Sequence, residues 1–260
     1  MLVAQISDFH VAVPGSELDR QQQTSARLER AAAQLGRLDP RPDLVLCTGD
    51  LVQDGQPEEY RRLVELLRPL PMPYYVIPGN HDDREGVRAA FAGHGYLPAS
   101  GPLCYVVDAG PLRLIGLDTL VPGAPHGRVC SEQLAWLDDR LSEAADRPTL
   151  VFMHHPPFRT GIVAMDAMGL DGADAFEEVV RRHPQVERIL CGHLHRPIVA
   201  RIAGTVASTA PSTASQLALD LRPDARIRLA PEPPAFQLHL WSDERRLVSH
   251  LVYVQGDDEA

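Results

Sequence analysis

Five short apolar runs in this sequence are each followed at once by side chains that can bind a metal ion. The clearest case is GNHD at residues 79–82, which places an amide, an imidazole and a carboxylate directly after the run YYVI and a proline. One such cluster would be an ordinary turn, because Gly, Asn and Asp are turn formers. The recurrence is the informative feature, and the side chains concerned are those of Asp8, His10, Asp50, Asn80, His81, Asp82, His154, His155, His193 and His195.

The chemical types of these side chains indicate which ions they would hold. Imidazole nitrogens, carboxylates and one amide oxygen, with no thiolate, suit divalent or trivalent Fe, Mn, Zn or Co. The set offers more ligands than one such ion accepts, and two ions about 3.5–4 Å apart need a group that touches both. A carboxylate has two oxygens and can form such a bridge. We expect Asp50 to be that bridge.

The side chains can meet only if the elements that carry them end at one edge of a sheet. Apolar runs typical of strands occur at residues 2–7, 43–49, 74–77, 104–108, 112–118, 149–153 and 187–191. Helical patterns lie between them, at residues 17–38, 57–70, 83–94, 131–145 and 171–183. This alternation predicts an α/β fold with a largely parallel, buried sheet, in which ligands bind beyond the carboxyl ends of the strands.

After Pro197 the pattern changes. Residues 198–209 and 236–254 are typical of paired strands without an intervening helix, and they predict a second sheet packed on the first. The connection 209–235 is long and rich in Pro and Ala, and connections of this length are usually functional. We expect it to be a long loop or cap at the rim of the cleft, or a contact between subunits of a homo-oligomer. Residues 1–260 are expected to form a single domain.

Composition excludes several classes of protein. The chain has no basic segment followed by a long apolar one, and no apolar run near the roughly 20 residues that span a bilayer, which predicts a cytoplasmic protein with no membrane partner. Its four cysteines lie far apart and form no CxxC pair, so neither a thiolate zinc site nor a disulfide framework is indicated. The net charge of −10 argues against general nucleic-acid binding. An anionic substrate would have to be attracted locally.

The ordered elements resemble the motif series D-x-H, G-D, G-N-H-[DE], H and G-H-x-H of the calcineurin-like metallophosphoesterase superfamily. The resemblance spans residues 8–195, and five elements in the family's order are far more specific than any one of them. Within that superfamily, the stretches GDLVQDGQPEEY, HHPPFRTGIVAMD and STASQ resemble bacterial class III cyclic nucleotide phosphodiesterases and glycerophosphodiesterases.

The resemblance implies a four-layer α/β-β/α sandwich of two mixed β-sheets flanked by helices, the metallophosphoesterase fold. It implies one metal ion held by Asp8, His10, Asp50 and His195, and a second held by Asp50, Asn80, His154 and His193. The catalytic residues would be Asp50, as the bridging ligand, and His81, as a proton donor or a stabiliser of the phosphoryl oxygens. Substrate contacts would come from Asn80, His81 and His155, with a hydrogen bond to a ligand as the other role for His155. Asp82 would orient His81 or its turn.

The implied activity is that of a dinuclear metal-dependent phosphodiesterase that hydrolyses small phosphodiesters, such as cAMP or glycerophosphodiesters, by attack of a metal-activated hydroxide. The segment 159–169 should border the metals, and it lacks the Arg or Lys cluster that would favour a monoester dianion. Two alternatives remain, namely a phosphomonoesterase or nucleotidase on the same site, and a non-catalytic metal-binding scaffold. The completeness of the ligand set favours an enzyme.

Overall fold

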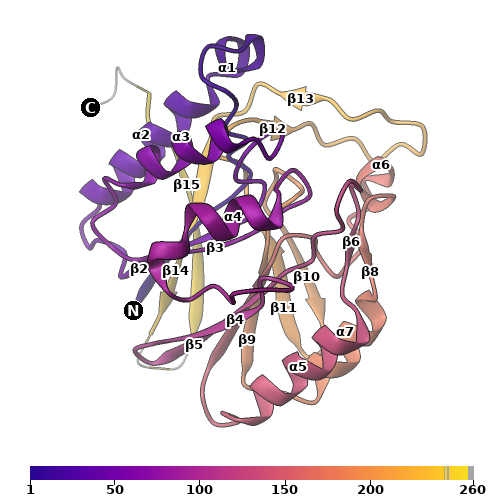
Figure 1. The fold of residues 1–260 in the computed structure, drawn as a ribbon. Coiled ribbons are helices and arrows are strands. Elements are labelled where there is room, and N and C mark those ends of the chain that lie inside the picture. The colour runs from indigo at the N-terminus through magenta and orange to yellow at the C-terminus, as the bar shows by residue number, and fades with distance from the viewer. Residues whose placement is uncertain (243, 245, 257–260) are drawn as a thin grey trace.

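Two mixed β-sheets pack face to face in the computed structural model, which describes residues 1–242, 244 and 246–256 (Figure 1). The first sheet has five strands in the order β15-β14-β1-β2-β3. Its strands are β1 (Leu2–Ile6), β2 (Leu44–Thr48), β3 (Tyr74–Ile77), β14 (Ala235–Trp241) and β15 (Leu247–Tyr253). Strands β1, β2 and β3 are parallel, whereas β14 runs antiparallel to β1. The carboxyl ends of β1, β2 and β3 therefore share one edge.

The second sheet has six strands in the order β10-β11-β9-β7-β5-β4. They are β4 (Tyr105–Ala109), β5 (Leu112–Leu117), β7 (Thr149–Met153), β9 (Val186–Cys191), β10 (Ile198–Ile202) and β11 (Thr205–Thr209). Strands β5, β7, β9 and β11 are parallel, and the antiparallel β4 and β10 lie at the two edges. Two short pairs lie outside the sheets, β6 (Gly127–Arg128) with β8 (Leu170–Asp171) and β12 (Gln216–Leu217) with β13 (Leu229–Ala230).

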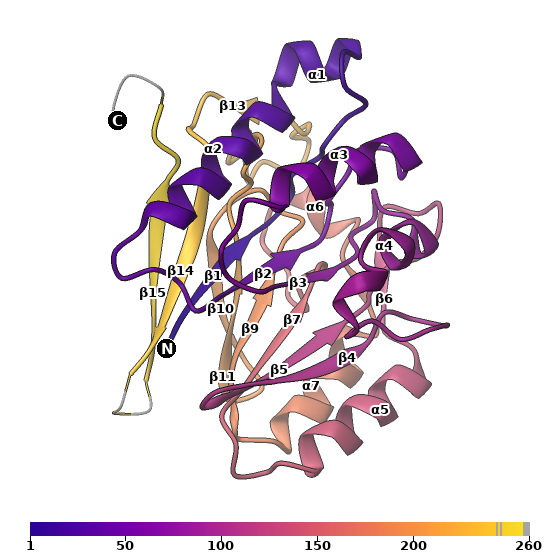
Figure 2. The same cartoon turned by 60° about the vertical axis from the view of Figure 1, so that its left-hand side comes forward.

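Helices cover the outer face of each sheet (Figure 2). The first sheet is covered by α2 (Thr24–Arg37), α3 (Pro57–Leu67) and α4 (Arg84–Ala90), and the second by α5 (Ser131–Ser142) and α7 (Ala173–Arg181). The short α1 (Glu17–Gln22), α6 (Val163–Asp166) and the 3₁₀ turn η1 (Ala92–His94) lie in connections. The predicted four-layer α/β-β/α sandwich is thus confirmed. No helix in the described part of the chain is long and apolar enough to cross a bilayer.

An apolar layer between the sheets holds them together. Leu46 on β2 and Leu150 and Phe152 on β7 belong to one buried cluster, and each is 0% exposed. Burying a side chain of this size stabilises a fold by about 1.5–3 kcal/mol. Because this layer is apolar and rigid, the loops at the carboxyl ends of both sheets are held at a fixed separation.

The prediction that residues 198–209 and 236–254 form a second sheet together was wrong. The hairpin β10–β11 joins the second sheet through β9, and the hairpin β14–β15 joins the first sheet through β1, so the two do not form a sheet of their own. The early parallel strands are instead divided between the two sheets. A hairpin can pair with any open sheet edge, and local sequence does not say which one.

The predicted helix over 17–38 is broken in two. Gln23 lies between α1 and α2 with φ at 52°, in the left-handed region that ends a helix. Helix α1 has no buried residues, whereas α2 buries one side, including Leu28 and Leu35. The burial of α2 therefore follows tertiary packing that the continuous helical pattern did not reveal.

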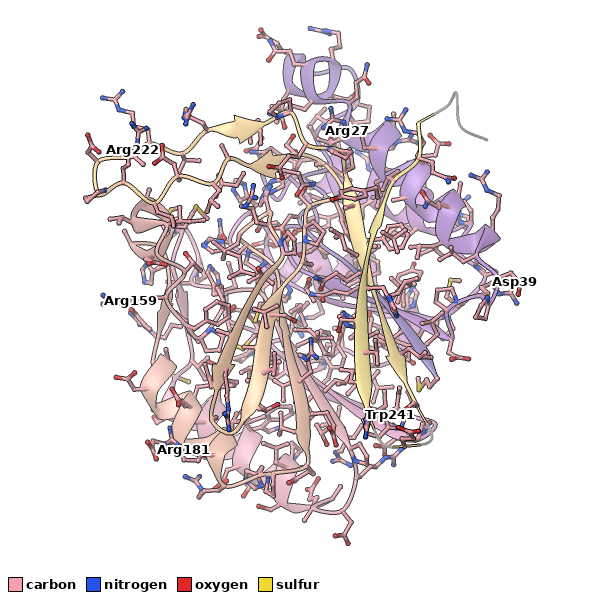
Figure 3. The ribbon with its side chains drawn as sticks, turned by 180° about the vertical axis from the view of Figure 1, so that it is seen from behind. Arg27, Asp39, Arg159, Arg181, Arg222 and Trp241 are labelled. Atoms are coloured by element: carbon pink, nitrogen blue, oxygen red, sulfur yellow. The ribbon has the colours of Figure 1, made fainter. Side chains whose placement is uncertain are left out.

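The connection 209–235 starts against the site loops and then projects as the β12–β13 ribbon (Figure 1). The Ser212 hydroxyl donates to the Asp8 carbonyl at 2.7 Å, and the Thr213 N–H donates to the Ser7 carbonyl at 3.1 Å. Farther out, Arg222 lies at the tip of the ribbon (Figure 3). A subunit contact through this segment stays a prediction.

Candidate metal centre

The candidate ligands lie in the loops that directly follow five parallel strands of the two sheets. Asp8 and His10 follow β1, Asp50 follows β2, Asn80 follows β3, His154 follows β7, and His193 and His195 follow β9. Strands β1, β2 and β3 belong to the first sheet, and β7 and β9 to the second. The centre therefore lies where the carboxyl ends of both sheets meet.

The first cluster is formed by Asp8, His10, Asp50 and His195, whose ligand atoms all lie within 4.8 Å of one another. The Nε2 atoms of His10 and His195 are 3.1 Å apart. His10 Nε2 is 3.6 Å from Asp50 Oδ2, and His195 Nε2 is 3.5 Å from Asp8 Oδ1. These are the four residues that the family resemblance implied would share an ion.

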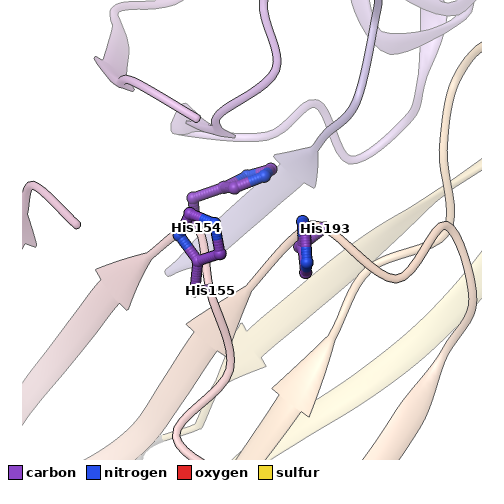
Figure 4. A group of neighbouring side chains, drawn as sticks. All are labelled: His154, His155 and His193. Atoms are coloured by element: carbon purple, nitrogen blue, oxygen red, sulfur yellow. The ribbon is translucent and has the colours of Figure 1, made fainter. Parts of the chain in front are cut away.

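The second cluster gathers around His154 (Figure 4). Its Nε2 atom is 3.2 Å from Asn80 Oδ1 and 3.4 Å from Asp50 Oδ1. The His193 ring centroid lies 5.2 Å from that of His154. Asp50 thus turns Oδ2 toward the first cluster and Oδ1 toward the second, an arrangement that allows the carboxylate to bridge two ions.

Each candidate histidine ligand has one ring nitrogen bonded to a carbonyl oxygen. The pairs are His10 Nδ1 with Gln53 Oε1 (3.1 Å), His154 Nδ1 with Thr48 O (2.8 Å), His193 Nε2 with Met168 O (3.1 Å) and His195 Nδ1 with Ser215 O (2.6 Å). A carbonyl only accepts, so the bonded nitrogen must carry the hydrogen. The other nitrogen of the neutral ring then holds the lone pair that a metal binds.

This donor set fits metal ions. With both tautomers fixed, the lone pairs of His10 Nε2 and His195 Nε2 face each other at 3.1 Å, where neither can donate to the other. Asp8 Oδ2 is buried and has no hydrogen-bond partner among the described residues. Lone pairs and an unpaired carboxylate oxygen converging in a buried space are unfavourable unless a cation lies between them.

The electrostatics differ between the clusters. Burial lowers the pKa of His10 and of His193 to about 3, so both rings are neutral near pH 7. Burial also acts to lower the pKa of His154, but the Asp50 carboxylate outweighs it and raises that pKa to about 9. Without an ion, His154 is therefore protonated and paired with Asp50.

The backbone at the candidate ligands is in an uncommon conformation. Asp8, His10, Asp50, His193 and His195 all have φ between 48° and 69°, in the left-handed region. Non-glycine residues there cost of order 1 kcal/mol each and cluster at functional sites. Hydrogen bonds hold the conformation, including Asp8 N–H to Gly49 O and His193 N–H to Asp8 Oδ1, both at 3.0 Å.

Two glycines allow the loops to approach this closely. A Cβ atom on Gly79 would lie 2.2 Å from Asp50 Oδ1, and one on Gly192 would lie 2.3 Å from Ser7 Oγ. Both distances are too short for any side chain. The glycines before Asn80 and His193 are therefore required by packing against the neighbouring loop.

Asp82 joins the loop after β2 to the loop after β3. Its carboxylate accepts hydrogen bonds from Leu51 N–H (3.1 Å), Val52 N–H (3.3 Å), Gly79 N–H (2.8 Å) and the Tyr60 hydroxyl (3.2 Å). Burial and the Asp50 carboxylate raise the pKa of Asp82 to about 7. These contacts are with the turn. Of the two predicted roles, orienting His81 or orienting the turn, Asp82 therefore has the second.

His81 lies beside the first cluster and is partly exposed. Its ring Nδ1 is 2.7 Å from the Gln53 carbonyl oxygen, and its backbone N–H donates to Asp50 Oδ1 at 3.0 Å. Its ring centroid is 4.7 Å from that of His10. Because Gln53 O accepts from Nδ1, the other ring nitrogen is left for a partner outside the loop.

His155 is buried beside the centre, and both of its ring nitrogens have partners. The residue is 0% exposed, and its Nδ1 and Nε2 atoms bond to Thr119 Oγ1 at 2.8 Å and to Pro125 O at 3.2 Å. Although its ring lies beside His154 and His193 (Figure 4), neither nitrogen is free for a substrate. In this geometry His155 fastens the loop after β5 instead of contacting a substrate.

Several residues that fix the ligands were not predicted. Gln53 and Ser215 lie in stretches that carried the family resemblance, yet the sequence alone gave them no role. The Ser212 hydroxyl holds the Asp8 carbonyl, and Tyr60 reaches Asp82 from helix α3. These contacts depend on tertiary packing, for which a single sequence gives no local signal.

A cavity of about 810 Å³ adjoins the centre at His193. Its walls include Phe158, Arg159, Met165 and Asp171, so the segment 159–169 borders the cavity beside the candidate ligand His193. Met168, in the same segment, contacts His193 through its carbonyl. Met165 packs against Leu194 and Leu217.

Comparisons with known proteins agree with this geometry. The family model for calcineurin-like phosphoesterases matches residues 1–197. A probable glycerophosphodiester phosphodiesterase of Arcobacter nitrofigilis is 36% identical over 255 residues, 98% of this chain and 93% of the relative. A 3',5'-cyclic adenosine monophosphate phosphodiesterase of Pseudomonas aeruginosa is 34% identical over 196 residues, 75% of this chain and 70% of the relative. A crystal structure of a dimetal phosphatase from Danio rerio shares the fold, with a TM-score of 0.67 at 16% identity, covering 98% of this chain and 99% of that one.

The protonated state of His154 predicts that metal binding depends on pH. Below its pKa of about 9, this ring must lose a proton before Nε2 can bind an ion. The affinity for one of the two ions should therefore rise roughly tenfold per pH unit up to that pKa and then level off. Calorimetric titration of the metal-free protein with Mn²⁺ from about pH 6.5 to 8.5 measures this. Equal affinity across that range would contradict the assignment.

The four donors around Asp82 predict that Asp82→Asn destabilises the metal-free protein. An amide has one acceptor oxygen, and its NH₂ group would face two of the donors. We expect the free energy of unfolding in urea at about pH 8.5, where the carboxyl is ionised, to fall by about 1–3 kcal/mol. Asp83→Asn is the matched control, because Asp83 is the N-cap of α4 and asparagine caps equally well. Equal effects of the two substitutions would rule out the role given to Asp82.

Proposed function

The chain belongs to the calcineurin-like phosphoesterase family, and we propose that it hydrolyses small phosphodiesters at a pair of metal ions held by the two clusters described above. Its relatives named phosphodiesterases cover most of the chain, and it is a metal-dependent phosphoric diester hydrolase. The observation that carries the proposal is the position of Asp50. Its two carboxylate oxygens face His10 on one side and His154 on the other.

The proposed ligands are the seven predicted ones. Asp8, His10, Asp50 and His195 would hold one ion, and Asp50, Asn80, His154 and His193 the other. When bound, two such ions supply a hydroxide near neutral pH and neutralise charge on the phosphoryl oxygens. The nitrogen and oxygen donors suit Fe, Mn, Zn or Co.

His81 is proposed as the proton donor to the leaving group. Its Nδ1–H is held by the Gln53 carbonyl at 2.7 Å, which fixes the ring and stabilises it when Nε2 also carries a proton. That nitrogen can then protonate the leaving alkoxide. Asn80, next in the chain and partly exposed, is proposed to contact the substrate as well as the second ion.

The charges near the site support a diester over a monoester. The chain has no lysine, and most of the arginines on the segments next to the ligands are already bonded, with Arg159 in the cavity wall as the exception among the described residues. Arg27 donates to Ala214 O, Arg84 to Asp118, and Arg196 to Leu217 O and Glu232. A dianionic monoester gains most from free guanidinium groups, whereas a singly charged diester needs them less.

The substrate class rests on the relatives. Those named above act, by their printed names, on glycerophosphodiesters and on 3',5'-cyclic adenosine monophosphate. We propose that this protein acts on one of these two classes. The cavity beside His193 has room for the organic part of either.

One panel of substrates tests the proposal. The protein loaded with Mn²⁺ should hydrolyse bis(4-nitrophenyl) phosphate at least about tenfold faster than 4-nitrophenyl phosphate, and cAMP or glycerophosphoethanolamine should be turned over as well. Asp50→Ala and Asn80→Ala should abolish diester hydrolysis while the proteins remain folded by circular dichroism. A higher rate on the monoester would favour a phosphomonoesterase, and no turnover of any ester would leave a metal-binding scaffold.

Removing the His81 side chain separates catalysis from metal binding. We expect His81→Ala to retain two bound ions per chain by elemental analysis, because no proposed ligand is lost. Diester turnover should fall by about 10²–10⁴-fold, the usual size of a general acid's contribution. An unchanged rate would remove the catalytic role of His81.

A further inference from the structure

One candidate ligand differs from the others in what orients its ring. His154, His193 and His195 donate to backbone carbonyls, which no side-chain substitution removes. His10 instead donates its Nδ1–H to the side-chain amide oxygen of Gln53, at 3.1 Å. Among these four rings, His10 is therefore the one whose hydrogen-bond acceptor can be removed by a side-chain substitution.

The backbone of Gln53 is held firmly in place. Its N–H donates to Val11 O at 3.1 Å, and Val11 and Val52 form a parallel bridge. Its carbonyl accepts from His81 Nδ1 at 2.7 Å. Gln53 thus contacts both His10 and His81, whose rings are 4.7 Å apart, through two different groups.

The two contacts can be separated experimentally. The side chain of Gln53 is partly exposed, so it can be exchanged without opening the core. Any such exchange keeps the backbone carbonyl, and with it the contact to His81. The effect of a substitution should therefore act through His10.

The strength of the acceptor on Nδ1 controls how good a ligand Nε2 is. An acceptor fixes the tautomer that leaves the Nε2 lone pair free, and a stronger acceptor makes that nitrogen more basic. A carboxylate is a stronger acceptor than an amide, and an alkyl group is none. Affinity at the first cluster should follow that order.

We propose that Gln53 is a positioning residue that sets the affinity of the first metal position through His10. This inference rests on the ligand set of the proposed function. It adds a determinant of metal affinity outside the seven predicted ligands. The acceptor strength at position 53 can also be varied stepwise, from none in Leu through the amide of Gln to the carboxylate of Glu.

The test compares Gln53→Leu and Gln53→Glu in the full chain. Metal-free proteins are titrated with Mn²⁺ by calorimetry, a measurement that needs no substrate. Gln53→Leu should weaken one of the two binding steps by about 10–100-fold and leave the other unchanged, whereas Gln53→Glu should match or exceed the parent affinity. The thermal shift produced by saturating Mn²⁺ should follow the same order.

Gln21→Leu and Gln21→Glu are the matched controls, because Gln21 is exposed on α1 and its side chain contacts only Glu17 in the described structure. Both should bind Mn²⁺ as the parent does. The proposal is overturned if Leu and Glu at position 53 give equal affinities, or if both weaken both steps alike, as a packing role would produce. If the Mn²⁺ affinities follow the predicted order but the protein does not hydrolyse diesters, the result would instead count against the proposed function.

Discussion

An imidazole can offer a lone pair to a metal only when its other nitrogen carries the hydrogen, and this requirement shapes the whole centre. Thr48, Met168 and Ser215 supply backbone carbonyls for three rings, and Gln53 supplies an amide oxygen for the fourth. The acceptors come from three separate segments of the chain, because Thr48 and Gln53 both lie at or just after the end of β2. The loops must therefore be in place before the ligand atoms can converge, so the centre depends on the complete fold.

Bringing the candidate ligand atoms together costs free energy locally, and the surrounding structure offsets that cost. The left-handed backbone at positions such as Asp8 and Asp50 is unfavourable for residues with a Cβ atom. The polar atoms around them are buried, and each unpaired one adds to the cost. Hydrogen bonds between the loops and the apolar layer that includes Leu46 and Phe152 provide compensating stability. Strain concentrated at the ends of rigid strands is typical of a functional site.

The candidate ligands could be proposed from the sequence because strand ends are readable. An apolar run followed by Asp, Asn or His gives both the element and the chemistry, and parallel strands bring such ends together. The break at Gln23 and the sheet joined by each late hairpin depend on tertiary contacts, so the same patterns did not reveal them. The surroundings of His155 were hidden for a related reason. Its type and its place beside His154 fitted a substrate contact, but Thr119 and Pro125, distant in sequence, take both nitrogens.

Polar contacts connect the two sheets at the end where the candidate ligands lie. Gln5 on β1 donates to Cys191 O on β9 at 2.9 Å, and Arg84 on α4 forks onto Asp118, which follows β5, at 2.6 and 3.1 Å. Asp50 faces His154 across the same junction. Ions bound on both sides of Asp50 would therefore link the sheets as well as serve the chemistry. Because a ligand that binds only the folded state stabilises it, the requirement that orients the imidazoles also couples metal occupancy to the packing of the two sheets.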